Sequence, residues 1–372
     1  MASTHAMRGI ASLPMEVYDE IAIFLANDYV SLLDRRDRLK CLRLVNIPFN
    51  RSATRILFSW VHIQMRHLGE DKDTLERRCP SRRKSIFEGD LPRYIRVLRI
   101  TIDWKDPPHG ETWWDEKIQE RTYETLSFCL GRLPSLQRLD IDTCGYVCLY
   151  ELVNSTLKAL QHAHLPRLSS LKIGPIGTPP VIDDALNPFL PQLRHLVISY
   201  GNPRKNEDLN SNVLRLLQLG HELHSIALFS WERAADYGCP MYESMQPFFH
   251  PCANIERLHL GWITIPYEFL GTICNYRKSL ADLEFYSVCL SSGTWEDFFR
   301  ELGECPMLSV LRVTSTCGYS YTSEGLSDSD TAAINLAKTK AKEREESLHW
   351  KTGGWSKKTA SLGFHLDALE VY

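Results

Sequence analysis

The sequence predicts an α/β protein, in which a short N-terminal helical domain precedes a solenoid with a curved parallel sheet and helices outside it. Two observations lead to this prediction. Apolar residues in the first part of the chain recur at the spacing of amphipathic helices. A short apolar motif then recurs along the remaining chain, as repeat architectures require. We place the helical domain at 10–68, a charged linker at 69–92 and the solenoid at 93–372.

The first helix is expected to begin next to Pro14. Apolar residues follow with the spacing of one helix face, at Val17, Ile21, Phe24 and Leu25. Pro14 is tolerated in a first helical turn because the N–H that it lacks would have no partner there. The chain at 27–37 is polar and charged, which predicts a loop or a weak helix.

Two further helices are expected in the helical domain. The second is predicted by apolar residues at helical spacing, namely Leu39, Leu42, Val45 and Phe49. Pro48 should limit or bend this helix, because proline breaks the hydrogen bonding of a helix interior. The third is predicted by a further apolar group, namely Ala53, Ile56, Leu57, Trp60 and Val61.

The repeat signal is an apolar triplet of the form apolar-x-x-apolar-x-apolar. The copies are Ile95-Leu98-Ile100, Leu136-Leu139-Ile141, Leu168-Leu171-Ile173, Leu193-Leu196-Ile198, Leu223-Ile226-Leu228, Ile255-Leu258-Leu260, Leu280-Leu283-Phe285 and Leu308-Leu311-Val313. A further match, Leu366-Leu369-Val371, ends the chain. Helix-like stretches lie between copies, for example at 123–130 and 295–302.

The spacing within a triplet explains why the copies should stack. The last two apolar positions are two residues apart, so in a strand they point to the same side. One copy cannot bury that side alone, whereas a stack of parallel strands can. The helices would cover the apolar side, and the intervening polar positions would face an open, concave side. Residues 314–361 interrupt the last copies and predict a loop followed by a solvent-facing helix.

The N-terminal pattern, Leu13-Pro14-x-Glu16-Val17 followed by the apolar positions above and Ile56-Leu57-Phe58, resembles the F-box motif. Residues 95–372 resemble the divergent leucine-rich repeats of F-box proteins, especially fungal ones. The resemblance implies three helices that bind a Skp-type adaptor and, through it, a cullin–RING ubiquitin ligase. It places adaptor-facing or core positions at Leu13, Pro14, Glu16, Ile21, Leu25, Leu42 and Val45.

The resemblance implies a substrate-recognition subunit that is not itself an enzyme, with the repeats holding an unknown protein target for ubiquitin-dependent degradation. A repeat scaffold that works without any ligase is the alternative. Aromatic residues and arginines dominate protein–protein hot spots. On that ground, the candidate target-binding positions on the concave side are Tyr200, Phe229, Arg257, His259, Trp262, Asp282, Glu284, Tyr286 and Arg312.

Other function classes find no support in the sequence. Histidines and cysteines do not form a set with accepted zinc spacing, and no catalytic motif is complete, so we predict no metal, cofactor or active site. The net charge of -3 gives no argument for a nucleic-acid partner. No apolar run is long enough to cross a bilayer, so we predict no membrane partner and a cytoplasmic or nuclear protein.

Overall fold

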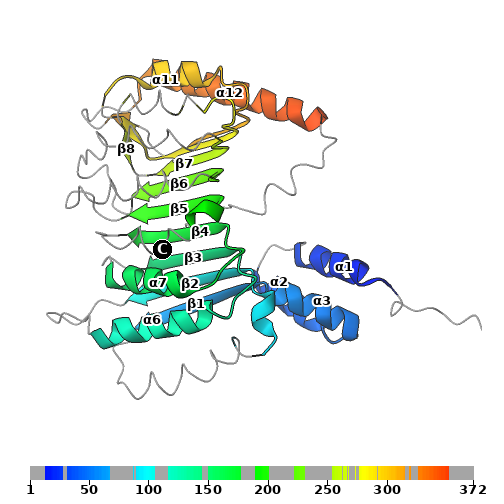
Figure 1. Ribbon diagram of the computed structural model, residues 1–372. Helices are drawn as coiled ribbons and strands as arrows, with labels where there is room; N and C mark the ends of the chain where they lie inside the picture. Colours follow the sequence, from blue (N-terminus) through cyan, green and yellow to red (C-terminus); the bar gives the residue numbers. More distant parts are fainter. Residues whose placement is uncertain are drawn as a thin grey trace, which may run out of the picture. The chain divides into compact units, whose positions relative to one another are not determined.

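The computed structural model describes residues 13–27, 32–67, 87, 89–104, 116–144, 150–176, 189–200, 222–230, 254–261, 263–265, 267, 273, 276–290, 292–314, 318–319 and 326–351 (Figure 1). The chain divides into two compact units, Met1–Ile173 and Gly174–Tyr372. The fold is α/β, with an open nine-stranded sheet in the order β1-β2-β3-β4-β5-β6-β7-β9-β11. The described part of the chain contains seven α-helices.

Three short helices form the N-terminal part of the first unit: α1 (Met15–Asn27), α2 (Leu32–Leu42) and α3 (Ile47–Leu57). The predicted second helix is wrong in its C-terminal half, because α2 ends at Leu42 and Phe49 belongs to α3. Asn46 explains the boundary, since its side-chain oxygen accepts a hydrogen bond from the Phe49 N–H at 2.8 Å. Pro48 therefore lies in the first turn of α3, where proline is tolerated.

The buried face of α1 differs from the predicted one. Tyr18 and Ala22 are fully buried, whereas Val17 and Phe24 are 37% and 67% exposed. The Tyr18 ring packs edge to face against the Phe49 ring, with centroids 4.7 Å apart. This aromatic contact joins α1 to α3 and turns Phe24 toward the surface, which spacing alone could not decide.

The predicted third helix also ends early, because Trp60 and Val61 lie in strand β1 (Trp60–His67). Strand β1 pairs in parallel with β2 (Val97–Trp104), and Val61 lies opposite Leu98. Phe58, Val61 and Ile63 fit the same triplet template, so the sequence contained a further copy that our prediction overlooked. The sheet thus begins inside the range 10–68 that we predicted for the helical domain.

The remaining strands of the sheet are β3 (Arg138–Cys144), β4 (Ser170–Ile176), β5 (His195–Tyr200), β6 (Ser225–Ser230), β7 (Arg257–Gly261), β9 (Asp282–Tyr286) and β11 (Val310–Thr314). Strands form at all eight predicted triplets, which confirms that part of the prediction. Every apolar residue of these triplets is buried except Val313, which is half-buried. The match at 366–371 lies outside the described residues.

A repeated backbone contact holds each triplet above the next. In the first unit the Ser59 carbonyl accepts hydrogen bonds from the N–H groups of both Arg96 and Val97. In the second unit the Ala281 carbonyl accepts from Ser309 and Val310 in the same way. The contact places equivalent residues opposite one another, as in the pairing of Leu258 with Leu283. Because side chains alternate along a strand, this register keeps every triplet on one side of the sheet.

The connections contain the 3-10 helices η2 (Leu91–Tyr94) and η3 (Leu190–Gln192) and the helices α6 (Glu116–Leu130), α7 (Tyr150–His162) and α11 (Trp295–Leu302). These include both helix-like stretches expected at 123–130 and 295–302. In the second unit, a small parallel sheet has the order β12-β10-β8. Its strands are β8 (Thr264–Ile265), β10 (Cys289–Leu290) and β12 (Gly318–Tyr319).

The last described helix, α12 (Asp328–Lys351), falls within the predicted insertion at 314–361. A helix was expected there, but its prediction as solvent-facing is incomplete, because Ile334, Ala337 and Ala341 are buried. The Lys338 ammonium donates to the Val313 carbonyl at 3.2 Å, and Arg344 donates to the Leu308 carbonyl at 3.2 Å. The helix thus satisfies carbonyl groups at the edge strand β11 that would otherwise be open to pairing with another chain.

A buried carboxylate fixes the start of α12 to α11. Asp330 is almost fully buried and accepts hydrogen bonds from the Glu296 N–H at 2.9 Å, the Ser327 N–H at 3.0 Å and the Ser327 hydroxyl at 2.7 Å. Its own N–H donates to the Ser327 hydroxyl oxygen at 3.1 Å. This is a reciprocal capping box that also caps α11.

We expect Phe285→Ala to lower the free energy of unfolding by about 3–5 kcal/mol, since a fully buried ring would leave a cavity. The Phe285 ring lies against three aromatic rings of α11, with centroids 5.6 to 6.1 Å away. Urea unfolding of the full chain measures the change. The exposed Met307→Ala should cost no more than about 0.5 kcal/mol, and equal losses in both variants would contradict the packing described.

We expect Asp330→Ala to cost about 2 kcal/mol or more, because several N–H and O–H donors would lose a charged acceptor. Asp330→Asn keeps one acceptor oxygen and should cost less. The neighbouring exposed Asp328→Ala is the control, with an expected loss of about 0.5 kcal/mol. Thermal unfolding of the three variants gives the order, and a loss in Asp328→Ala as large as that in Asp330→Ala would refute the role of Asp330.

Candidate functional site

Several of the predicted target-binding residues lie on three neighbouring strands of the second unit. Arg257 and His259 come from β7, Asp282 and Glu284 from β9, and Arg312 from β11. All of them occupy strand positions that alternate with the buried triplets, so they share the opposite face of the sheet. We call this opposite face the polar face, and these five residues the charged ladder. Tyr286 lies on the same face, next along β9.

Arg312 holds the two carboxylates of the charged ladder. One guanidinium nitrogen, Nη2, donates to both oxygens of Asp282 at 3.0 Å, and Nε donates to Glu284 Oε2 at 3.0 Å. His259 lies beside them, with Nε2 3.6 Å from Asp282 Oδ2 and Nδ1 3.8 Å from Glu284 Oε2. The carboxylate side chains are only 18% and 12% exposed, whereas Arg312 is 47% exposed. A fork of this kind is the strong form of ion pair.

The environment of Asp282 keeps its carboxyl group ionised. Burial by itself would raise the pKa of Asp282. The proximity of His259 and the charges of Arg312 and Arg257 outweigh burial and hold the pKa of Asp282 below its ordinary value of 3.8. The charged ladder therefore acts as an internal brace between β7, β9 and β11.

This brace changes the reading of the predicted residues. The sequence placed Asp282 and Glu284 among the candidate target-binding positions, but both carboxylates already contact Arg312. A partner that engages these carboxylates has to compete with groups of the same chain. Within the described segments, no three His, Cys, Asp or Glu side chains gather so that they could hold a metal ion.

The remaining predicted target-binding residues do not join the charged ladder. Phe229 on β6 is buried in a small apolar cluster with Val197 and Ala227. Its ring lies over Gly261, where an added Cβ would approach the ring to 2.4 Å, so only glycine fits there without a shift. The side chain of Tyr200 and the whole of Trp262 lie outside the described residues.

The first unit carries a second set of charges on its polar face, which the prediction of the site did not include. Asp142 on β3 accepts a hydrogen bond from Arg99 on β2 at 3.1 Å and lies 3.5 Å from the Lys172 ammonium on β4. Arg138 and Asp140 form a separate pair at 2.8 Å. The signal was present in the sequence, because these residues alternate with the buried triplet residues; Arg99, Arg138, Asp140 and Lys172 hold the triplet-relative positions of the charged ladder, and Asp142 holds that of Tyr286.

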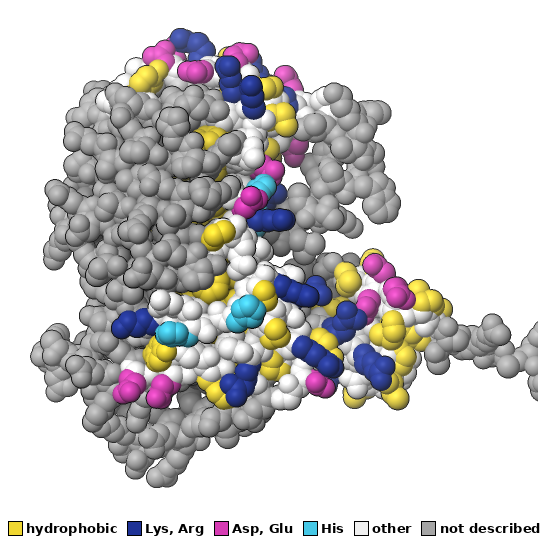
Figure 2. All heavy atoms as spheres, viewed as in Figure 1, with side chains coloured by type: hydrophobic (Ala, Val, Ile, Leu, Met, Phe, Trp, Pro, Cys, Tyr) yellow, Lys and Arg dark blue, Asp and Glu magenta, His cyan; other side chains and the backbone are white. Residues whose placement is uncertain are grey.

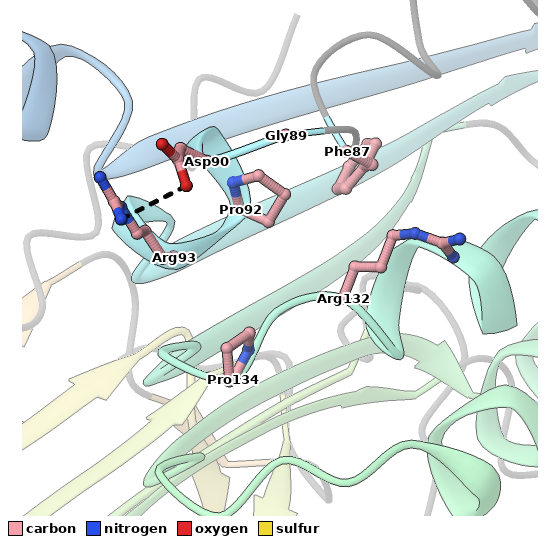
Figure 3. A pocket seen from close by; sticks show the side chains of 7 residues that line it. All are labelled: Phe87, Gly89, Asp90, Pro92, Arg93, Arg132 and Pro134. Carbon is pink, nitrogen blue, oxygen red and sulfur yellow. Dashed lines mark ion pairs between the residues drawn. The ribbon is translucent and has the colours of Figure 1, made fainter.

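A hollow of about 430 Å³ lies in the first unit, away from the predicted residues (Figure 3). Its lining residues are Phe87, Gly89, Asp90, Pro92, Arg93, Arg132 and Pro134. Arg93 pairs with Asp90 at 3.3 Å, and the Arg132 guanidinium stacks on the Phe128 ring at 3.6 Å from its centroid. Both arginines are thus engaged locally, and the lining offers no nucleophile paired with a base.

The three N-terminal helices expose many apolar side chains. We name the exposed set the apolar helical surface; it consists of Leu13, Val17, Ile23, Phe24, Leu44, Val45 and Ile47. Figure 2 shows hydrophobic side chains in yellow over this part of the molecule, mixed with basic ones in blue. Leu44 and Val45, in the turn after α2, are 86% and 63% exposed.

The predicted adaptor-binding residues divide between this surface and the small core beneath it. Leu13 and Val45 are exposed members of the apolar helical surface, and Pro14 and Glu16 are exposed beside it. Ile21, Leu25 and Leu42 are half-buried, and Leu42 packs against the core pair Leu39 and Ala53. The predicted adaptor-binding set lacks the exposed Ile23, Phe24, Leu44 and Ile47. Helical periodicity marked Phe24 as apolar, but it does not say which apolar residues remain exposed.

Neither the protein-family models nor the curated proteins compared with this sequence match it. None of the described helices is both long and apolar enough to span a bilayer.

The lowered pKa of Asp282 predicts a pH dependence of stability. A carboxyl group whose pKa is lower in the folded than in the unfolded chain stabilises the fold above its ordinary pKa, and that contribution is lost as the pH falls through the folded value. We therefore expect the difference in unfolding free energy between wild type and Asp282→Asn to shrink from about pH 6 to about pH 3.

Asp297→Asn is the matched control, because it removes the same charge from the exposed surface of α11. We expect it to give a smaller difference that varies less with pH. Urea unfolding at each pH measures both variants. A constant difference for Asp282→Asn over the whole range would show that the carboxylate does not stabilise the fold through its charge.

Proposed function

We propose that this protein is the substrate-recognition subunit of a cullin–RING ubiquitin ligase of the SCF type. In this proposal α1–α3 form an F-box that binds a Skp-type adaptor, and the stacked strand–helix units are leucine-rich repeats that hold a target protein. The chain itself would perform no chemistry. Its contribution would be proximity, which raises the effective concentration of target lysines near the activated ubiquitin.

The apolar helical surface is the observation that carries the proposal. Each large apolar side chain contributes about 1.5–3 kcal/mol when it is fully buried. Several such residues could offset the cost of association, which is about 4–15 kcal/mol. A surface of this kind on so small a helical group is unusual unless a partner covers it.

The internal structure of the helices also fits a docking module. Their core is small: the most buried apolar side chains are Tyr18, Ala22, Leu39, Phe49 and Ala53, and an ion pair between Asp19 and Arg55 at 3.0 Å joins α1 to α3. Several further large apolar side chains of the three helices are exposed. Such a module gains stability when a partner binds its folded form.

The test is adaptor binding by a variant of the turn between α2 and α3. We expect Leu44→Asp with Val45→Asp to weaken binding to a purified Skp-type adaptor by at least about a hundredfold, since both charges would be buried unpaired in the complex. Titration calorimetry measures the affinity. Circular dichroism should show the helix content of the wild type, because both side chains are exposed before binding.

Leu336→Asp provides the matched control, because Leu336 is an exposed apolar residue on helix α12 of the second unit. It should bind the adaptor as the wild type does. Equal affinity for the adaptor in the Leu44/Val45 variant would reject the surface assignment. A wild-type chain that binds no Skp-type adaptor would leave the alternative, a repeat scaffold that acts without a ligase.

A further inference from the structure

The polar face of β1–β4 has a surplus of positive charge at one point. The carboxylate of Asp142 is shared by two cations, Arg99 and Lys172, which are 25% and 20% exposed. Arg138 neutralises the only other carboxylate described on these strands, that of Asp140. One positive charge therefore has no counterpart among the side chains described on this face, and Arg99 keeps N–H groups that can donate to another acceptor.

His62 lies beside Arg99, and the positive charge of Arg99 affects its pKa. It lies opposite Arg99 in the strand pairing, and its Nε2 is 2.8 Å from the Thr101 hydroxyl oxygen. Burial and the positive charge of Arg99 lower the pKa of His62, against the smaller opposing effect of Asp142. The imidazole therefore stays neutral at neutral pH and remains a hydrogen-bonding group beside Arg99.

An exposed aromatic ring lies next to His62 at the start of β1. Trp60 begins β1, is 43% exposed, and has its ring centroid 5.9 Å from that of His62. Tryptophan next to arginine is the composition that carries most of the energy in protein interfaces. The face thus combines an exposed aromatic ring on β1 with an arginine on the adjacent strand β2 and a lysine on β4.

We propose that the polar face of β1–β4 is a docking surface for an acidic peptide segment. A carboxylate of the segment would lie between Arg99 and Lys172, and a neighbouring apolar side chain would pack on Trp60. This deepens the proposed function by naming the chemistry of the target, and it rests on that function only for the role of the bound segment. The surface would bind the peptide whether or not an adaptor is bound.

One other polar region and one other kind of partner fit less well. In the charged ladder, the two arginines Arg312 and Arg257 are matched by the two carboxylates Asp282 and Glu284, and His259 also lies beside those carboxylates, so the arginines leave no positive charge in surplus for a partner. A nucleic acid is also disfavoured on β1–β4, because Asp140 and Asp142 would repel a chain of phosphates while only one positive charge is in surplus. A peptide can offer a single carboxylate to the cations, in competition with Asp142, without bringing a row of further negative charges near the aspartates.

The test uses the full chain and a short, capped, fluorescein-labelled peptide of Glu, Gly and Leu, with a second peptide in which Lys replaces Glu. Fluorescence anisotropy measures binding. We expect the glutamate peptide to bind, the lysine peptide to bind much more weakly, and added salt to weaken the complex. Arg99→Gln and Lys172→Gln should each weaken binding about three- to tenfold.

Asp142→Asn is the decisive variant. Removing the carboxylate that Arg99 and Lys172 share frees both cations, so we expect the glutamate peptide to bind more tightly, by about threefold or more. Circular dichroism shows whether the variant is folded, so weaker binding by a folded Asp142→Asn chain counts against the proposal. Arg300→Gln changes the net charge as Arg99→Gln does, but lies on α11, and it should leave the affinity unchanged.

Three results would overturn the proposal: equal binding of the lysine peptide, weaker binding by Asp142→Asn, or a larger loss in Arg312→Gln than in Arg99→Gln. Failure of the proposed function is distinguishable. Leu44→Asp with Val45→Asp should lose the adaptor and keep the peptide, whereas Arg99→Gln should do the reverse. A chain that binds the peptide but no adaptor would refute the ligase role alone.

Discussion

The stacking of apolar triplets in register is the interaction on which the rest of the structure depends. Each triplet places two side chains on one face of a strand, and the shared backbone carbonyl before the strand fixes the next copy directly opposite. Because strand side chains alternate, a shift by one residue would expose the core and bury the charges. The register therefore determines the polar face as well as the core, and side chains far apart in sequence become neighbours on it.

The polar face shows how the same scaffold gives two different electrostatic outcomes. At β7, β9 and β11, the Arg312 guanidinium of β11 donates hydrogen bonds to both carboxylates of β9, Asp282 and Glu284, and these charges stabilise the fold. At β2–β4, two cations share one carboxylate, and part of their charge is left over for a partner. The difference arises from which residue occupies an equivalent position on each strand, since the backbone geometry repeats.

The two ends of the described sheet differ in what accompanies them. At β11, Lys338 and Arg344 of α12 donate to edge carbonyls, and Asp330 secures that helix to α11. Next to β1 in the sequence lie the three helices whose apolar side chains are largely exposed. A repeat array requires protection at its ends. Here α12 provides it at β11, whereas the N-terminal helices expose several large apolar side chains.

Sequence alone determined the positions of the eight triplet strands and the first helix, because buried apolar residues must recur at the period of the element that buries them. It did not determine where α2 ends, since Asn46 and Pro48 act through local capping that an apolar pattern conceals. Nor did it determine that Phe24 is exposed while Tyr18 is buried. It also did not show that Arg312 forms hydrogen bonds with Asp282 and Glu284. Those outcomes depend on contacts between residues distant in the chain, and only the tertiary structure brings such residues within bonding distance.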